Sequence, residues 1–232
     1  MRTALATLTL LLALTARADE PAWEVVLKGP VTIKNRAIPG TPLKEIEAEG
    51  DIGAPLEDVQ DALLNTSRLA SFMPYMKASR ELTERDAENS KYLYTLIDLP
   101  VVGQRDYVVR VWVLEARANG TGEFRQKWEA VPSYLPERES IRRIKVNNGS
   151  WHITAINENS CHAVYRFSVD PGGWVPAFAI NLANQQGVAP TFTTLQKEGL
   201  KRRAERLAAA YPDRTFYVLH SGRRFGKPER AR

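Results

Sequence analysis

The stretch VVGQRDYVVRVWV, Val101 to Val113, has the alternation of a strand with one face in the protein interior. Successive side chains of a strand point to opposite faces, so every second residue belongs to one row. The more apolar row, which begins with a charged residue, consists of Arg105, Tyr107, Val109, Val111 and Val113. The opposite row begins with Asp106. A charged Arg-Asp dipeptide therefore stands at the start of an otherwise apolar strand.

The residues on either side of this stretch predict a run of strands. The expected strands are residues 77–84, 91–97, 105–115, 122–131, 139–147, 150–157 and 162–169. Turn-forming residues at 119–122, 147–150 and 157–160 separate several of them. Such short connections favour antiparallel neighbours. Nearer the N-terminus, residues 23–36 predict a strand and a turn, and residues 42–52 predict a strand with one apolar and one acidic row.

Helical spacing of apolar residues appears in three places. Residues 55–63 predict a short helix with Pro55 at its first position, and residues 67–73 predict a second, which ends before Pro74. From Pro176 to about Ala210 we expect one long helix, bent near its middle by Pro190. A curved antiparallel sheet wrapped around one long helix is an α+β helix-grip fold. Such a fold often leaves an internal apolar cavity.

The beginning of the chain has the pattern of a secretory signal peptide. Residues 1–18 combine Arg2, an apolar run and a small-residue ending, which predicts cleavage after Ala18. The apolar run is shorter than the roughly 20 residues that a membrane span needs. We therefore expect a signal peptide at 1–18, a single lipid-binding domain at 19–215 and a basic tail at 216–232. The mature protein is expected to be soluble and periplasmic or secreted.

The charge distribution and the cysteine content indicate which partners and which disulfides to expect. The formal net charge is +5, and from His220 onward five basic residues stand against one acidic residue. This tail is either a solvated terminus or a point of transient contact with anionic membrane. Nucleic acid is not an expected partner, because export argues against it and the aromatic residues lie mainly in the predicted strands. Cys161 is the single cysteine, so it is interpreted as a buried thiol in a chain without an internal disulfide, which we expect to be a monomer.

Two segments resemble START domains, the family of steroidogenic acute regulatory protein-related lipid transfer domains. Residues 102–111, VGQRDYVVRV, resemble the family's glycine-Arg-Asp-aromatic strand entry, and residues 168–182, SVDPGGWVPAFAINL, resemble its passage into the lid helix. The resemblance spans residues 23–210. It implies a tunnel for one lipid, commonly a sterol or phospholipid, gated by residues 98–104 and a helix beginning near Trp174. Sterol-binding members carry a second arginine on the cavity face, where this chain has valines.

The residues expected to line the tunnel are those on the inward-facing rows of the predicted strands and on the apolar face of the predicted long helix. The predicted ligand-binding residues are Arg105, Tyr107, Val109, Val111, Trp128, Trp151, Ile153, Tyr165, Phe167, Ile180 and Asn184. Each of them could equally be ordinary core. Arg105 and Asp106 either pin the loop that precedes the strand or offer a polar contact to a lipid head group.

An enzyme is the alternative, because related helix-grip proteins include polyketide cyclases and hydrolases. His152 and His162 could act as general bases. Each lies alone in its predicted strand without a neighbouring carboxylate on the same face, so we expect no catalytic group. The three histidines and one cysteine show no metal-ligand spacing, and neither a metal nor another cofactor is expected.

Overall fold

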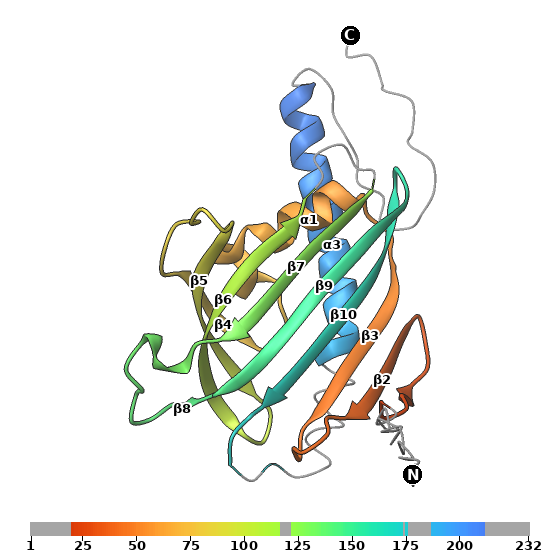
Figure 1. Ribbon diagram of the computed structural model, residues 1–232. Helices are drawn as coiled ribbons and strands as arrows, with labels where there is room; N and C mark the ends of the chain where they lie inside the picture. The colour runs from red at the N-terminus through yellow and green to blue at the C-terminus, as the bar shows by residue number, and fades with distance from the viewer. Residues whose placement is uncertain (1–19, 117–121, 174, 176–186, 212–232) are drawn as a thin grey trace, which may run out of the picture.

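One strongly curved antiparallel sheet organises the molecule, as the computed structural model shows for residues 20–116, 122–173, 175 and 187–211 (Figure 1). The strand order is β1-β2-β3-β10-β9-β7-β6-β5-β4, and the short β8 adds to β6 in parallel. The strands are β1 (Glu24–Leu27), β2 (Val31–Ala37), β3 (Lys44–Ile52), β4 (Met76–Glu81), β5 (Ser90–Leu99), β6 (Gly103–Glu115), β7 (Glu123–Ala130), β8 (Arg142–Arg143), β9 (Val146–Asn157) and β10 (Ser160–Asp170). Neighbouring strands are consecutive in the chain, except that β3 pairs with β10, β7 with β9 and β6 with β8.

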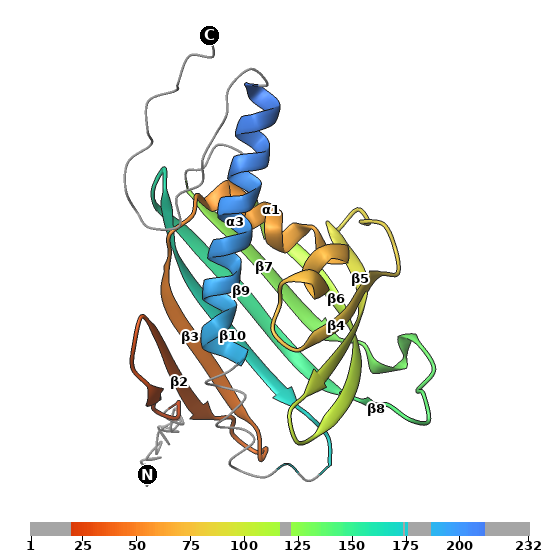
Figure 2. The same cartoon turned by 180° about the vertical axis from the view of Figure 1, so that it is seen from behind.

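The helices lie on the inner face of the sheet. Helix α3 (Ala189–Ala210) crosses that face, and α1 (Leu56–Leu64) and the 3-10 helix η1 (Thr66–Ser71) lie beside it (Figure 2). A second 3-10 helix, η2 (Pro132–Tyr134), follows β7. This arrangement confirms the predicted α+β helix-grip fold.

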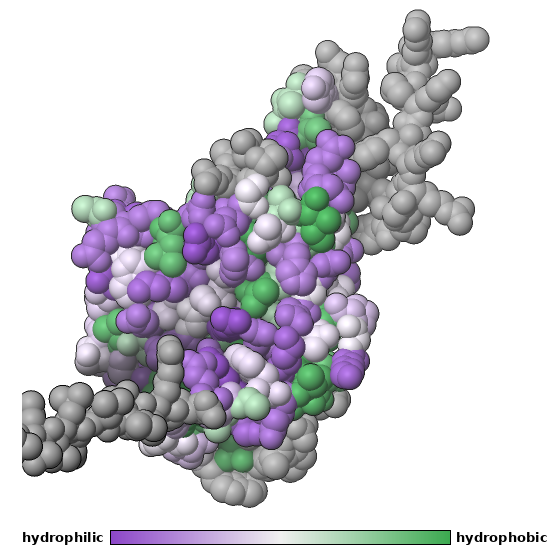
Figure 3. Space-filling model, turned by 45° about the vertical axis from the view of Figure 1, so that its right-hand side comes forward, coloured by the Kyte–Doolittle hydropathy of each residue, from purple (hydrophilic) through white to green (hydrophobic). Residues whose placement is uncertain are grey.

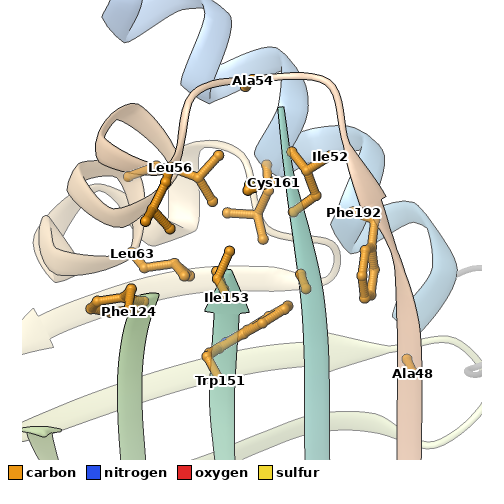
Figure 4. Close-up of a cluster of buried hydrophobic side chains, with 14 of the residues drawn as sticks. Ala48, Ile52, Ala54, Leu56, Leu63, Phe124, Trp151, Ile153, Cys161 and Phe192 are labelled. Carbon is orange, nitrogen blue, oxygen red and sulfur yellow. The ribbon is translucent and has the colours of Figure 1, made fainter. Parts of the chain in front are cut away.

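The main core lies where α1 and α3 meet the sheet (Figure 4). Phe192 and Leu195 of α3 pack there against side chains from β3, β7, β9, β10 and α1. Gly199 permits the two helices to approach, because a Cβ atom at this position would lie 2.9 Å from the Cβ of Ala54 and 3.2 Å from Val59. The core therefore anchors the N-terminal half of α3, from Phe192 to Gly199. The first turn of that helix remains beside the pocket described below.

The expected turn at residues 147–150 does not exist. These residues belong to one continuous strand, β9, which runs from Val146 to Asn157. Gly149 serves another purpose, because a Cβ atom there would lie 2.3 Å from the Trp128 ring. The glycine thus makes room for an indole on the neighbouring strand β7. The same segment had been predicted as two strands, and of residues 139–145 only Arg142 and Arg143 form a strand, β8.

The described part of the long helix is α3, which runs from Ala189 to Ala210 and has Pro190 in its first turn, where proline is well tolerated. The two residues before it, Gly187 and Val188, have π-helical geometry. Residues 176–186, which include the predicted Ile180 and Asn184, lie outside the described residues.

The outer face of β3 is less exposed to solvent than its row of acidic residues predicts. Glu47 is only 4% exposed and forms ion pairs with Lys34 at 3.1 Å and with Arg166. Burial by itself disfavours the charged carboxylate, but the hydrogen bonds from Arg166 and Lys34 prevail and lower the pKa of Glu47. An ion-pair network therefore joins β2, β3 and β10 on that face. On the side of the molecule in Figure 3, apolar residues appear only as small areas among hydrophilic ones.

Candidate functional site

An apolar cavity of about 480 Å³ lies between the inner face of the sheet and the beginning of α3. Strands β2, β3, β5 and β10 contribute to it, together with the loops that follow η1, β5 and β10. Its lining consists of Asn35, Pro42, Lys44, Ile46, Pro74, Tyr75, Ile97, Leu99, Pro100, Val102, Ile144, Tyr165, Phe167, Val169, Pro171, Val175, Gly187, Val188 and Thr191. Among these described lining residues there is no carboxylate, imidazole or thiol. We refer to this cavity as the apolar pocket.

Stacked aromatic rings form one side of the apolar pocket. Tyr165 stacks on Phe167 at 4.8 Å between ring centroids and on Trp151 at 4.2 Å. The register of β9 and β10 places Tyr165 directly opposite Trp151. Trp151 in turn packs against Phe192 of α3. Burial raises the pKa of Tyr165, which keeps its phenol neutral, so this side of the pocket presents uncharged ring surface.

Part of the inner row of β6 lies in a second, smaller buried cluster. Val109 and Val111 are buried with Leu93 in a small cluster, against which Tyr107 and Trp128 pack. The Trp128 indole Nε1 donates a hydrogen bond to the Asn147 Oδ1 at 3.0 Å. Burial raises the pKa of the Tyr107 hydroxyl, which forms hydrogen bonds with Thr95 and Asn147.

The predicted ligand-binding residues thus fall into four groups. Tyr165 and Phe167 line the apolar pocket. Arg105 lines a neighbouring polar pocket. The remaining described residues pack in the two buried clusters and are Tyr107, Val109, Val111, Trp128, Trp151 and Ile153. Ile180 and Asn184 lie outside the described residues.

Arg105 and Asp106 do not pair with each other. The Arg105 guanidinium donates hydrogen bonds to the backbone carbonyls of Val102 and, at 3.2 Å, of Pro171. It therefore links the loop before β6 to the residue that follows β10. Asp106 faces the other way and holds Arg143 with two hydrogen bonds of 2.7 and 3.2 Å. The two side chains have separate partners because adjacent residues of a strand occupy opposite faces.

A polar pocket of about 820 Å³ adjoins the apolar pocket, and Val102 lines both. The polar pocket lies among the loop before β6, the segment around β8 and the residues after β10. It is lined by Val102, Gln104, Arg105, Glu137, Arg138, Glu139, Ser140, Ile141, Arg142, Arg143, Lys145, Asp170 and Gly172.

Some loop residues of the apolar pocket were not nominated from the sequence. Strand parity and helical spacing point only to residues inside regular elements, whereas Pro74, Tyr75 and Pro171 lie between elements. Pro100 and Val102, which also line the pocket, belong to the segment 98–104 that the family resemblance implied to be a gate. Tyr75 has a positive φ of 60°, and its ring lies against Gly187. The prolines that flank these loops were the available signal, since they mark chain reversals at one end of the sheet.

The two strand histidines have carboxylate partners after all. His152 contacts Glu123, and His162 contacts Asp51 at 2.8 Å through its Nδ1. The partners come from adjacent strands, which a single strand's sequence does not reveal. Both pairs are solvent-exposed and belong to neither pocket. Within the described residues there is no group of three or more His, Cys, Asp or Glu side chains that could hold a metal ion.

Cys161 is fully buried in the main core. Burial, and secondly the charge of Asp51, raise the pKa of its thiol to about 12. A protonated thiol surrounded by apolar side chains is a packing residue and not a nucleophile.

Comparisons with known proteins agree with this geometry. The model of the polyketide cyclase / dehydrase and lipid transport family matches residues 52–192. The crystal structure of a STAR-related lipid transfer protein fragment from Xanthomonas axonopodis is 28% identical, with a TM-score of 0.62, over 78% of this chain and 98% of that one. No curated protein matches the chain.

Two more distant structures share the fold alone. Human STARD10 is 18% identical with a TM-score of 0.67, over 82% of this chain and 77% of that one. The Zhui aromatase/cyclase from a Streptomyces species is 12% identical with a TM-score of 0.52, over 69% of this chain and 96% of that one. No helix in the described part of the chain has the length and apolar character to cross a membrane.

Proposed function

The chain belongs to the polyketide cyclase / dehydrase and lipid transport family, and we propose that it binds one hydrophobic lipid in the apolar pocket and carries it between membranes. The observation that carries this proposal is the apolar pocket itself. Its volume of about 480 Å³ falls within the roughly 300–1,000 Å³ typical of small-molecule sites. The name of the Xanthomonas relative, a lipid transfer protein, supports the same function.

Burial alone supplies enough free energy for binding. Removing apolar surface from water yields roughly 25 cal/mol per Å², so a lipid that buries several hundred Å² gains on the order of 10 kcal/mol. Lost translational and rotational freedom offsets part of this gain. A pocket lined by uncharged rings and aliphatic side chains needs no specific polar contact to retain such a ligand.

Features at the end of the apolar pocket support exchange with a membrane. Val101, in the loop between β5 and β6, is 64% exposed and has a positive φ of 71°, which is an unfavourable backbone conformation for valine. Its neighbours Pro100 and Val102 line the pocket. An apolar residue presented to solvent beside the pocket suits contact with a lipid surface during uptake and release.

A volume-filling variant tests the proposal. Val169 lines the pocket from β10, so Val169→Trp should fill part of the cavity and reduce the transfer of a fluorescent lipid between vesicles at least severalfold. Ser168→Trp adds the same indole to the opposite face of the strand and is the matched control. Native mass spectrometry of protein purified from its own host should recover about one lipid per chain. Equal transfer by both variants, at equal stability in urea, would contradict the proposal.

A cyclase- or hydrolase-like enzyme acting in the same pocket is the second candidate, because the family description includes polyketide cyclases and dehydrases. Lys44, Tyr75 and Tyr165 are the titratable groups among the described lining residues. Burial raises the pKa of both tyrosines, which disfavours their action as bases near neutral pH. Turnover of an added ester or polyketide by lipid-free protein would favour this candidate over carriage.

We further propose that the protein works in the periplasm and touches anionic membrane through its basic tail. The signal-like residues 1–18 and the basic residues after His220 support this, although both segments lie outside the described residues. Deleting residues 220–232 should weaken binding to anionic vesicles and leave lipid affinity unchanged. Equal vesicle binding by the truncated protein would contradict the role of the tail, and retention of residues 1–18 in exported protein would contradict cleavage.

A further inference from the structure

The pairing of β6 with β8 sorts four charged residues onto two faces. In the parallel register Arg105 lies opposite Arg142, and Asp106 lies opposite Arg143. On one face Asp106 and Arg143 neutralise each other. On the other face two guanidinium groups are neighbours. Arg105 and Arg142 both line the polar pocket.

The charge of Arg105 is buried and unpaired. The residue is 7% exposed, and the partners of its guanidinium are the neutral carbonyls of Val102 and Pro171. Burial, and secondly the charge of Arg142, lower the pKa of Arg105, which is the direction expected where no carboxylate compensates the charge. An arginine nevertheless stays protonated at neutral pH.

Arg142 adds a second unpaired charge at the same place. Its side chain extends along Gly172 and Gly173, where a Cβ atom would lie 3.0 Å and 3.2 Å from it. Both glycines have positive φ angles of about 70°. Within the described residues no carboxylate forms an ion pair with Arg142 or Arg105.

The other charged groups of the polar pocket reduce its positive charge but do not cancel it. Lys145 is paired with Glu137 at 3.3 Å, and Asp170 accepts a hydrogen bond from the backbone N–H of Gly172 at 2.8 Å. Glu139 also lines the pocket, where it forms no ion pair with a described residue. Arg138, whose Nη1 donates to the Tyr94 hydroxyl, contributes a third guanidinium. Three unpaired guanidiniums therefore face two carboxylates.

A site of this kind favours an anion with several oxygens. The planar guanidinium group matches phosphate and carboxylate geometry, and such charge-assisted hydrogen bonds are about twice as strong as neutral ones. Burying a charge without a counter-charge is unfavourable, and for Arg105 this desolvation takes place on folding. An anion that binds there therefore gains the electrostatic attraction without desolvating the guanidinium again. A neutral or cationic group would gain nothing comparable there.

We propose that Arg105 and Arg142 bind the anionic phosphate or carboxylate head group of an amphipathic lipid whose apolar part occupies the apolar pocket. The shared residue Val102 places the two pockets side by side. Arg105 also heads the inner row of β6, on which Tyr107 follows. This inference rests on the proposed lipid-binding function and specifies the class of lipid: one with a negative charge at its polar end.

The test compares two probes with the same fluorescent acyl chain, a lysophosphatidic acid and a monoacylglycerol. The full mature protein should bind the phosphate-bearing probe about tenfold more tightly than the neutral one, the effect of one charge-assisted hydrogen bond at a partly exposed site. Arg142→Gln should remove most of that preference and leave the affinity for the neutral probe unchanged. Because Arg142 is exposed, this variant is expected to fold. Arg125→Gln, an exposed residue of β7 outside both pockets, is the control for net charge.

Two outcomes would overturn the inference and are distinguishable from failure of the proposed function. Equal affinity of wild-type protein for both probes would show that the polar pocket does not select an anion, while lipid binding itself would stand. An equal effect of Arg142→Gln and Arg125→Gln would reduce the role of Arg142 to bulk electrostatics. Binding of neither probe would instead refute lipid binding, and this inference with it.

A last arm separates a lipid head group from a free ion. Inorganic phosphate is titrated against the protein with the apolar pocket empty and with it filled by the neutral probe. If free phosphate binds as tightly as the phosphate-bearing probe in both cases, the polar pocket is an independent ion site and the assignment to a head group falls. If phosphate competes only weakly, and only with the phosphate-bearing probe, the assignment to a head group is supported.

Discussion

Replacing Asp106 with asparagine tests how the beginning of β6 is held in place. The side chains of Asp106 and Arg143 are 0% and 1% exposed, and their carboxylate-guanidinium contact is bidentate. Arg143 also donates to the carbonyls of Pro132, Leu135 and Pro136, which fixes the segment after β7 over this strand. The substitution keeps the shape and one acceptor oxygen but leaves the guanidinium charge buried without a counter-charge.

Removing one partner of a buried ion pair costs about 3–5 kcal/mol. For a domain of this size we expect Tm to fall by about 6–20 °C, since each kcal/mol corresponds to roughly 2–4 °C. Urea unfolding followed by circular dichroism gives the free energy of unfolding directly. The control is Arg110→Gln, which removes ion pairs with Asp86 and Glu88 on the outer face of the same strand and should cost much less than Asp106→Asn, because those carboxylates are exposed to solvent.

The double variant Asp106→Leu/Arg143→Met removes both charges. It should regain much of the lost stability, because apolar residues of similar volume often replace a buried ion pair at little cost. A loss below about 1 kcal/mol for Asp106→Asn, no greater than that of Arg110→Gln, would refute the argument that an uncompensated charge determines the stability of this strand.

Three further predictions concern other parts of the core and the sheet. Gly149→Ala should lower the free energy of unfolding in urea by about 1–3 kcal/mol, because its methyl group would overlap the Trp128 ring. Cys161 should react with a disulfide reagent at pH 8 about a thousandfold more slowly in the native than in the urea-unfolded protein, since its pKa of about 12 leaves little thiolate. Glu47→Gln should reduce stability at pH 7: folding lowers the pKa of this carboxyl below its usual 4.5, so its contribution exists above that pH and disappears on acidification, and the difference between variant and wild type should vanish near pH 2.

The regular elements were predictable because their side chains follow simple periods. The strand predicted in Val101 to Val113 is β6, and the strand predicted in residues 42–52 is β3. In both, the alternation of apolar and polar residues shows which face of the strand is buried. The predicted turn at Asn147 to Ser150 was wrong because the sequence signal is local. An Asn-Gly pair is a strong turn signal when only the local chain is considered, and the Trp128 ring that requires a glycine there comes from another strand.

The site was less predictable than the fold. Parity nominated Tyr165 and Phe167, which line the apolar pocket, and also Val109 and Val111, which are buried with Leu93. Parity alone does not distinguish pocket lining from close packing. Cross-strand partners are likewise absent from a single strand's sequence. The contacts of Arg105 with Pro171, 66 residues away, depend on tertiary structure alone.

The pairing of β3 with β10 has a consequence for the order of folding. These neighbouring strands are distant in the chain, and the contact between Glu47 and Arg166 spans 119 residues. The N-terminal strands therefore cannot find their place in the sheet until most of the polypeptide has been synthesised. Forming such long loops is slow, and we expect refolding on the millisecond-to-second scale of proteins rich in non-local contacts. Until then β3 and β10 expose the backbone groups that later pair with each other.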